Sequence, residues 1–345
     1  MKKLALFACA FTALIFTNCD KEPVGYDSSD NFESNFSFNK QSNLNGTSIY
    51  VSSNTSGVLG IFDISTGMMS PTLKSINVPY ADADGVEYDG NRDAVYQVNR
   101  TDKNLVAVAN ISRTSDGDLV TPSAIGPSSF TNGRGSALYN NKVVIADDIM
   151  PGRLASYHVN DDQISDFRNY NVGFKVWDVQ VTGKDLWAIE DLTNILAYFQ
   201  NFHNAKSGDL PPTAEVAIEG LVRTHGLNYD TSSDTMVLTD IGSAAGMPNS
   251  ASDGALIIIK NFTQKFHAAG DGGMISLSDQ IRIAGDMTQL GNPVDVAISS
   301  SKGAIFVAER AQQKLLIFDI PTENCNCAPV YSTAFAGASS VTTDF

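Results

Sequence analysis

The sequence predicts an all-β fold, a six-bladed β-propeller closed by its C-terminal strand, and three observations favour it. A short apolar phrase recurs six times, a second phrase rich in β-branched and aromatic residues precedes each copy, and one repeat is divided between the two ends of the chain. Short segments of this composition, bounded by Gly, Asn, Asp or Ser, are typical of β-strands. Strand units repeated along a whole chain are typical of sheets arranged around a common axis.

Two phrases predict the middle strands of each blade. The first reads GVLGIFDIS at residues 57–65 and QKLLIFDIP at residues 313–321, and its third position is apolar in every copy. The second phrase reads SIYVSSN at residues 48–54 and AIFVAER at residues 304–310. It carries a large apolar side chain at one repeated position, namely Tyr50, Tyr96, Val144, Trp187, Val237 and Phe306. Such a column suits packing between neighbouring sheets.

A third phrase predicts the innermost strands. It precedes the second phrase in five repeats and begins at Asp84, Gly135, Trp177, His225 and Val294. The first repeat has no such phrase upstream, whereas residues 339–345, SSVTTDF, supply one at the other terminus. We therefore expect the C-terminal strand to complete the first sheet and to close the ring, which hides sheet edges that would otherwise be unpaired.

The outermost strands are less regular. We expect them near residues 69–76, 119–125, 163–172, 213–218, 274–283 and 330–335. The chain after its first 18 residues shows no strong helical period, which argues against a helical fold. The alternative to six blades is seven, with the additional blade inside residues 264–292.

The N-terminus predicts export and anchoring. Residues 1–18 are expected to be a lipoprotein signal peptide, because two lysines precede an apolar run too short to span a bilayer. Cys19 follows directly, and the segment resembles the lipobox of bacterial lipoproteins, which implies that Cys19 is lipidated; the alternative is an ordinary cleavage site before Cys19. Residues 19–45 are polar and aperiodic, as expected of a disordered tether, and residues 46–345 are expected to form the propeller. The predicted location is the outer membrane or the cell surface.

Composition restricts the partners. The chain has 23 Lys and Arg against 38 Asp and Glu, a net charge of −15. Such a field repels phosphate backbones and anionic membranes, so nucleic acid is excluded and the membrane is contacted only through the lipid. We expect a monomer that binds a small molecule or a protein of the cell envelope. Cys325 and Cys327 are expected to form a disulfide, because no His or further Cys lies nearby to complete a zinc site.

The phrase pattern over residues 48–345 resembles the YVTN, NHL and lactonase-like propeller families. The resemblance implies the fold. In the lactonase-like members a divalent cation lies at the channel mouth, held by acidic and amide side chains at strand starts, which implies Asp178 and Asp295 as metal ligands here. Crowded carboxylates of this kind raise one another's pKa or bind a cation, and oxygen ligands favour Ca²⁺ or Mg²⁺ over zinc. Apart from such an ion, the sequence predicts no cofactor.

A binding face is predicted where inner strands begin and second strands end, because both positions lie at one mouth of the channel. Its expected residues are Asp84, Arg100, Arg134, His225, Asp240 and Glu309. Most converging positions carry carboxylates, so we expect an acidic face. The alternative is that these acids cap turn N–H groups. His225 is the candidate general base if the protein is an enzyme; otherwise it bonds a loop carbonyl.

Binding is favoured over catalysis. The sequence has no G-x-S-x-G elbow, no H-E-x-x-H, and no cysteine nucleophile with a histidine partner. We therefore expect a lipid-anchored envelope module that binds a ligand through the acidic mouth. The alternative function is a divalent-metal-dependent, lactonase-like hydrolase or lyase. The loop at residues 242–254 is longer than its counterparts and is expected to take part in recognition.

Overall fold

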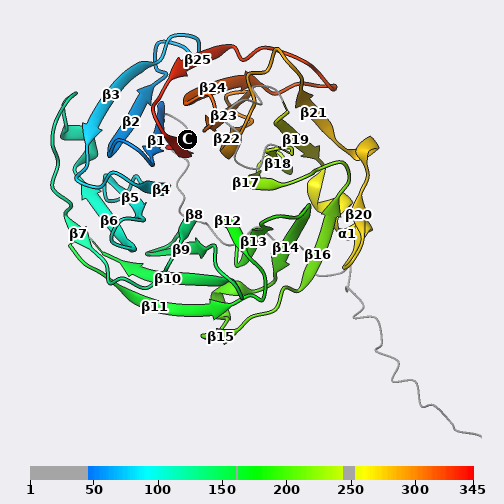
Figure 1. Ribbon diagram of the computed structural model, residues 1–345, viewed down its shortest axis with the longest axis horizontal. Helices are drawn as coiled ribbons and strands as arrows, with labels where there is room; N and C mark the ends of the chain where they lie inside the picture. Colours follow the sequence, from blue (N-terminus) through cyan, green and yellow to red (C-terminus); the bar gives the residue numbers. More distant parts are fainter. Residues whose placement is uncertain (1–45, 161, 244–252) are drawn as a thin grey trace, which may run out of the picture. The chain divides into compact units, whose positions relative to one another are not determined.

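The computed structural model describes residues 46–160, 162–243 and 253–345, all within the compact unit Phe38–Phe345. The predicted signal peptide, Cys19, the tether and most of the 242–254 loop lie outside the described residues. The described chain forms six sheets arranged in a ring, which confirms the six-bladed β-propeller (Figure 1). The innermost strand of each sheet faces the common centre, and the C-terminus lies there too (Figure 1).

Each blade runs from an innermost strand at the channel to an outermost strand at the rim. In that order, the first three blades contain β26 (Ala338–Thr343), β1 (Ser48–Ser53), β2 (Val58–Asp63) and β3 (Thr72–Asn77); β4 (Ala83–Asp89), β5 (Ala94–Asn99), β6 (Asn104–Ala109) and β7 (Ala124–Ile125); and β8 (Gly133–Tyr139), β9 (Lys142–Asp147), β10 (Arg153–Val159), β11 (Ile164–Asn171) and β15 (Gly208–Asp209). The last three contain β12 (Val176–Thr182), β13 (Asp185–Glu190), β14 (Ile195–Phe199), β16 (Ala214–Ile218) and β20 (Met274–Ile275); β17 (Thr224–Asp230), β18 (Thr235–Asp240), β19 (Ala255–Lys260) and β21 (Ile281–Ala284); and β22 (Pro293–Ser299), β23 (Ala304–Glu309), β24 (Lys314–Asp319) and β25 (Tyr331–Ala334).

The C-terminal strand closes the ring as predicted. β26 pairs antiparallel with β1, with Ile49 opposite Thr343 and Val51 opposite Val341. The first blade therefore combines β1, β2 and β3 from the N-terminal part of the described chain with β26 from its C-terminal end. β26 supplies the innermost strand of this blade.

The segment 264–292 differs from both sequence-based expectations. It contains neither a seventh blade nor one long outer strand. The helix α1 (Phe262–Ala269) opens the region, β20 pairs with β16 of the preceding blade, and only β21 completes the fifth sheet. Phe262 and Phe266, four residues apart, are buried on one face of α1 and pack against Trp187. The four-residue spacing of Phe262 and Phe266 indicates a helix, and the expectation of strands in this region did not take it into account. The remaining helical turns are the short 3-10 segments η1 (Ile111–Arg113), η2 (Phe202–Asn204) and η3 (Leu277–Asp279).

The hydrophobic core lies between neighbouring blades. One cluster, for example, joins Tyr96 and Leu105 of the second blade to Val143, Ala155 and Tyr157 of the third. The second-strand residues Tyr50, Tyr96, Val144, Trp187, Val237 and Phe306 are all buried, at 7% exposure or less. These side chains lie in cores shared by neighbouring sheets, and their packing holds each blade against the next.

One hydrogen bond is repeated in every blade. The N–H of the residue just after the second strand donates to the carbonyl of a residue before the innermost strand. The pairs are Asn54 with Gly337, Arg100 with Asp82, Asp148 with Asn132, Asp191 with Lys175, Ile241 with Arg223, and Arg310 with Asn292. This bond places the start of each inner strand and the end of each second strand side by side at one mouth of the channel.

Candidate functional site at the channel mouth

A β-bulge at the start of every inner strand divides the predicted site residues into two rows. In the second blade, for example, Ala83 pairs with Asn99 and Val86 with Gln97, so that Asp84 and Gly85 oppose one residue. Equivalent register shifts occur in the other five blades. The first bulge positions form the mouth row, Asp84, Arg134, Trp177, His225, Val294 and Ser339. The second form the channel row, Gly85, Gly135, Asp178, Gly226, Asp295 and Ser340.

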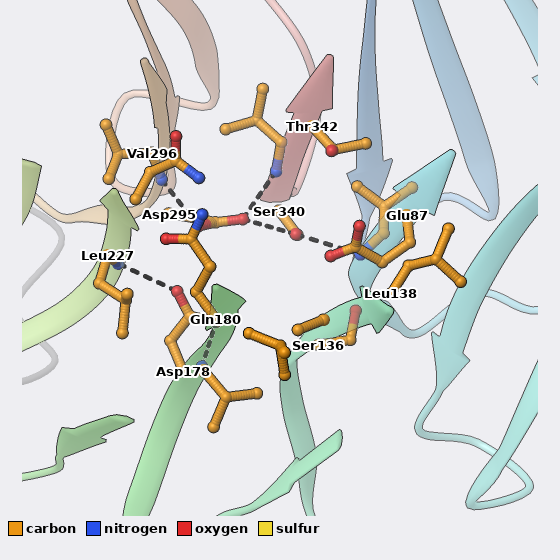
Figure 2. A pocket seen from close by; sticks show the side chains of 16 residues that line it. Glu87, Ser136, Leu138, Asp178, Gln180, Leu227, Asp295, Val296, Ser340 and Thr342 are labelled. Carbon is orange, nitrogen blue, oxygen red and sulfur yellow. Dashed lines mark hydrogen bonds between the residues drawn. The ribbon is translucent and has the colours of Figure 1, made fainter. Parts of the chain in front are cut away.

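The channel row does not belong to the mouth, contrary to the expectation that grouped Asp178 and Asp295 with Asp84 and His225. Figure 2 shows both carboxylates in the central cavity, with Ser340 beside Asp295. Asp178 accepts bonds from the N–H groups of Val179 (2.8 Å) and Leu227 (3.0 Å). Leu227 lies in the next blade, so Asp178 ties the fourth blade to the fifth.

Asp295 ties the sixth blade to the closing strand. It accepts bonds from the N–H of Val296 (2.7 Å), the N–H of Val341 (2.8 Å) and the hydroxyl of Ser340 (2.5 Å). Ser340 Oγ in turn accepts a bond from the N–H of Val86 in the second blade, at 3.2 Å. One carboxylate thus connects three neighbouring blades.

The channel row does not fit a bound Ca²⁺ or Mg²⁺. Every oxygen of Asp178 and Asp295 already accepts a hydrogen bond from the protein, and the described residues contain no group of three or more His, Cys, Asp or Glu side chains placed to hold an ion. The cavity they line measures about 60 Å³, whereas one water needs roughly 10–15 Å³ on this scale. It has room for a few waters and not for a sugar lactone.

The buried pair makes stability depend on pH. Burial raises the pKa of Asp295 to about 7, and burial together with the charge of Asp295 raises the pKa of Asp178. In the unfolded chain both groups ionise near pH 4. Between about pH 4 and 7 the folded state therefore binds more protons, so the free energy of unfolding falls as pH rises through this window.

We expect the double variant Asp178→Asn, Asp295→Asn to lose stability less steeply from pH 4.5 to 7.5 than the parent in urea unfolding. Asp319→Asn is the matched control, because Asp319 is an exposed aspartate of the sixth blade. Parallel curves for parent and double variant would contradict the pKa assignment.

Ion pairs join four blades across the mouth in an alternating chain. Asp82 and Asp84 contact Arg100, Asp84 contacts Arg134, Arg134 and Lys175 contact Asp148, and Lys175 and Arg223 contact Asp191. The separations are 2.9 to 3.9 Å. We call these eight residues, together with Trp177 and His225, the mouth cluster. It contains four of the predicted binding residues: Asp84, Arg100, Arg134 and His225.

Trp177 lies at the centre of the mouth cluster. Its ring stacks on the imidazole of His225 at 3.6 Å with parallel planes, and the guanidinium of Arg134 lies 4.2 Å from the ring centre. Arg223 approaches the same ring at 5.8 Å. Cations over an indole ring are attracted to its face, so Trp177 holds two guanidinium groups in place.

His225 is neutral in this environment. Its side chain is 4% exposed, and Nε2 lies 3.5 Å from Asp191. Burial lowers the pKa of His225 to about 4, although Asp191 acts in the opposite direction. Within the described part of the chain, Nδ1 has no hydrogen-bond partner. The imidazole therefore carries a buried nitrogen that no described group satisfies.

The four cations of the mouth cluster are more exposed than three of its four acids, whereas the fourth acid, Asp82, is 39% exposed. Side-chain exposure is 21% for Arg100, 17% for Arg134, 30% for Lys175 and 20% for Arg223. It is only 7% for Asp84, 4% for Asp148 and 0% for Asp191. Burial raises the pKa of both Asp84 and Asp148, whereas the neighbouring His225 and Arg223 outweigh burial and lower the pKa of Asp191. A ligand at this mouth therefore meets the four cationic heads and the carboxylate of Asp82, whereas the other three carboxylates are buried.

Asp240 and Glu309 act differently from the other predicted binding residues. Asp240 accepts bonds from the N–H groups of Val222 (3.1 Å) and Arg223 (3.0 Å), and Glu309 accepts them from four backbone N–H groups of the adjoining loops. Both are the last residues of second strands, one position before Arg100, Asp148 and Asp191 in the repeat. The structure favours the capping role for these two acids.

Trp177, Lys175 and Arg223 were not among the predicted site residues. Their signal is positional: Asp82, Lys175 and Arg223 each lie two residues before a member of the mouth row. It becomes visible only when the repeats are aligned on the bulge. Elsewhere, Cys325 and Cys327 are joined as a disulfide in the last blade's outer loop. No helix in the described ranges has the length and apolar character needed to cross a bilayer.

Comparison with known proteins identifies the fold. No family model matches the chain, and no curated protein matches it. Among solved structures, a chain from a nidogen–laminin complex superposes with a TM-score of 0.61 at 11% identity, covering 87% of this chain and 99% of that one. A protein from Bacteroides uniformis and one from Bacteroides fragilis, both proposed to be 6-phosphogluconolactonases, give TM-scores of 0.58 and 0.56 at 8% and 11% identity. Each comparison covers 86% of this chain, with 99% and 98% of the respective neighbour. At this identity the likeness shows the β-propeller fold, and nothing of the chemistry.

Proposed function

We propose that the protein is a lipid-anchored envelope module that binds a small anionic ligand at the mouth cluster. The observation that carries the proposal is the difference in exposure between the four cationic heads, at 17–30%, and the three carboxylates of Asp84, Asp148 and Asp191, at 0–7%; Asp82, at 39%, is the one exposed acid of the cluster. The acids orient the cations without covering them. Because bidentate guanidinium groups recognise carboxylate and phosphate with defined geometry, Arg100 and Arg134 are the expected ligand contacts.

The unsatisfied donors support the same proposal. Nε of Arg100 and Nε of Arg134 are buried without an acceptor among the described residues. Unpaired buried donors are costly, so a ligand that shifts these two side chains and supplies acceptors would relieve that cost. A sugar acid has both the charge and the hydroxyl groups for such a site.

The proposal is tested by isothermal titration with gluconate and with gluconate 6-phosphate. We expect Arg134→Gln and Arg100→Gln to weaken binding about tenfold to a hundredfold, since each removes a charged hydrogen bond. Arg113→Gln, on an exposed 3-10 turn, is the control and should bind like the parent. Arg134→Lys keeps a positive charge beside Asp84 and should fold like the parent. Weakened binding in this folded variant would reflect the lost guanidinium contact and not a loss of structure. Unchanged affinity in both Gln variants, or no heat with either probe, would contradict the proposal.

Lactone hydrolysis is the second candidate. Two structural neighbours are proposed 6-phosphogluconolactonases, and an anionic sugar lactone suits cations at the mouth. Neutral His225 beside Asp191 has the protonation state of a general base. Against this, its free nitrogen is buried, so catalysis would need the Trp177 stack to open. Turnover of 6-phosphogluconolactone that is lost in His225→Gln would favour the enzyme; binding without turnover favours the module.

The proposed anchor gives an independent prediction. Cys19→Ser is expected to move the protein from the membrane fraction to the soluble fraction of cells, because the lipid would be its only attachment. Cys9→Ser, within the segment expected to be cleaved, is the control and should fractionate like the parent. Unaltered fractionation of Cys19→Ser would refute lipidation.

A further inference from the structure

A second cationic cluster lies on the third blade, among the strands β9, β10 and β11 (Figure 1). Three basic groups surround the ring of Phe167: the guanidinium carbon of Arg168 at 4.4 Å, the imidazole of His158 at 4.3 Å and Nζ of Lys142 at 5.1 Å. Lys142 also lies 5.8 Å from the ring of Tyr139, on which His203 stacks at 5.0 Å. We call Lys142, His158, Phe167, Arg168 and His203 the third-blade patch.

A bulge in β11 brings these groups together. Ser156 pairs with Arg168 and Tyr157 with Asp166, so Phe167 has no partner on β10. Consecutive side chains of a regular strand point to opposite faces, whereas a bulge lets neighbours share one. Phe167 and Arg168 therefore both face Lys142 and His158. Arg168 is fixed further by NH1, which donates to the carbonyls of His203 and Ala205.

The patch concentrates positive charge on an acidic protein. Lys142 lies directly opposite His158 in the β9–β10 pair, an arrangement that destabilises a sheet when both groups are charged. Within the described residues, neither Lys142 nor Arg168 has a carboxylate within 4.0 Å, although the chain has 38 acidic residues. Asp185 is the acid that acts on His203, and it lies in the neighbouring blade.

The titration of the patch follows from this geometry. Burial, then Lys142 and Arg168, lower the pKa of His158, and burial, then Lys142, lower that of His203. Burial and Arg168 lower the pKa of Lys142 as well. An anion between the groups acts against all three shifts and raises each pKa, because each positive form then gains a partner.

We propose that the third-blade patch binds an oxyanion, the sulfate or phosphate group of a small ligand, held by Arg168 and Lys142 with proton uptake at His158. Arg168 contributes the planar fork, pre-oriented by its carbonyl contacts, and Lys142 the second charge. Binding should strengthen as pH falls from 7 to 5, because a protonated His158 adds a third cation. The source is a free ion or an ester group on a sugar, and the two are separable by experiment.

The test is an NMR titration of the imidazole signals of the full protein with sodium sulfate, which does not titrate in this range. Sodium chloride of equal ionic strength is the reference. We expect sulfate to raise the pKa of His158 by about one unit, a tenfold linkage, and Arg168→Gln to reduce this shift and weaken binding about tenfold. Arg168→Lys should recover part of it. Lys302→Gln is the matched control, since Lys302 also lies over an aromatic ring, at 5.2 Å from that of Phe345, but outside the patch.

A second arm uses glucose 6-sulfate. Tighter binding than sulfate indicates an ester-bearing sugar, and equal binding indicates the free ion; both support the site. If Arg168→Gln fails to fold, Lys142→Gln carries the same comparison. An unchanged pKa of His158 at 50 mM sulfate, or an equal shift in chloride, or an undiminished shift in the Gln variant, would overturn the proposal.

Discussion

Removing Ala338–Phe345 is expected to abolish cooperative folding. The deletion removes β26, which is the innermost strand of the first blade. It also removes the hydrogen bonds that the Ser340 hydroxyl and the Val341 N–H donate to Asp295. Ala338 and Val341 are buried in the cluster that joins the sixth blade to the first. The deletion exposes the inner edge of β1 and leaves the ring open. We expect the resulting loss of folding free energy to exceed the roughly 5–15 kcal/mol that stabilises a typical domain.

The measurement is thermal unfolding followed by circular dichroism. We expect no native transition in the shortened chain, and a partial recovery when a peptide of residues 338–345 is added, because the missing strand can pair in trans. Removing Phe345 alone is the control; it takes away the ring contacts with Phe306 and Lys302 and the acceptor of the Thr343 hydroxyl, and leaves β26 whole. A shortened chain that melts at the parent's temperature would contradict closure by β26.

Gly152→Ala is expected to be the most damaging single substitution near the mouth. Gly152 has φ of +80°, and a Cβ atom there would overlap the carbonyl oxygen of Phe174. Phe174 directly precedes Lys175, so this close approach helps to place the Lys175 head between Asp148 and Asp191. We expect a loss of more than about 3 kcal/mol, since neither backbone can move without disturbing a blade.

Gly173→Ala separates strain from overlap. Gly173 also has a positive φ, +90°, but nothing lies within 4 Å of its missing Cβ. Its substitution should cost only the left-handed backbone penalty, about 1–2 kcal/mol. Urea unfolding of both variants measures the difference. Equal losses would mean that the contact between Gly152 and Phe174 contributes nothing beyond backbone strain.

The ring was predictable from sequence because its repeated phrases, and the phrase missing from the first repeat, can be read directly from this chain. The SSVTTDF segment at residues 339–345 was predicted to be an inner strand because the sequence upstream of Ser48 offers no such phrase. The seven-blade alternative and the outer strand at 274–283 arose because Phe262 and Phe266 were not recognised as one face of a helix. A helix of eight residues gives too short a window for periodicity to decide.

The site was predictable only in part, and the β-bulge is the reason. A phrase alignment that ignores the bulge groups Asp178 with Asp84, although one residue separates their rows and turns their side chains to different surroundings. The same slip concealed Trp177, which occupies the position of His225 and Asp84. A count of carboxylates also does not show which of them are buried, as three of the four acids of the mouth cluster are.

The most direct test of the mouth cluster uses Trp177 as the reporter. The chain has two tryptophans, so Trp187→Phe leaves Trp177 alone to fluoresce. Because Trp177 contacts Arg134, Arg223 and His225, we expect gluconate 6-phosphate to change its emission in a saturable manner, with half-saturation at higher concentration in Arg134→Gln. An emission that stays constant while calorimetry reports binding would place the ligand elsewhere and contradict binding at the mouth cluster.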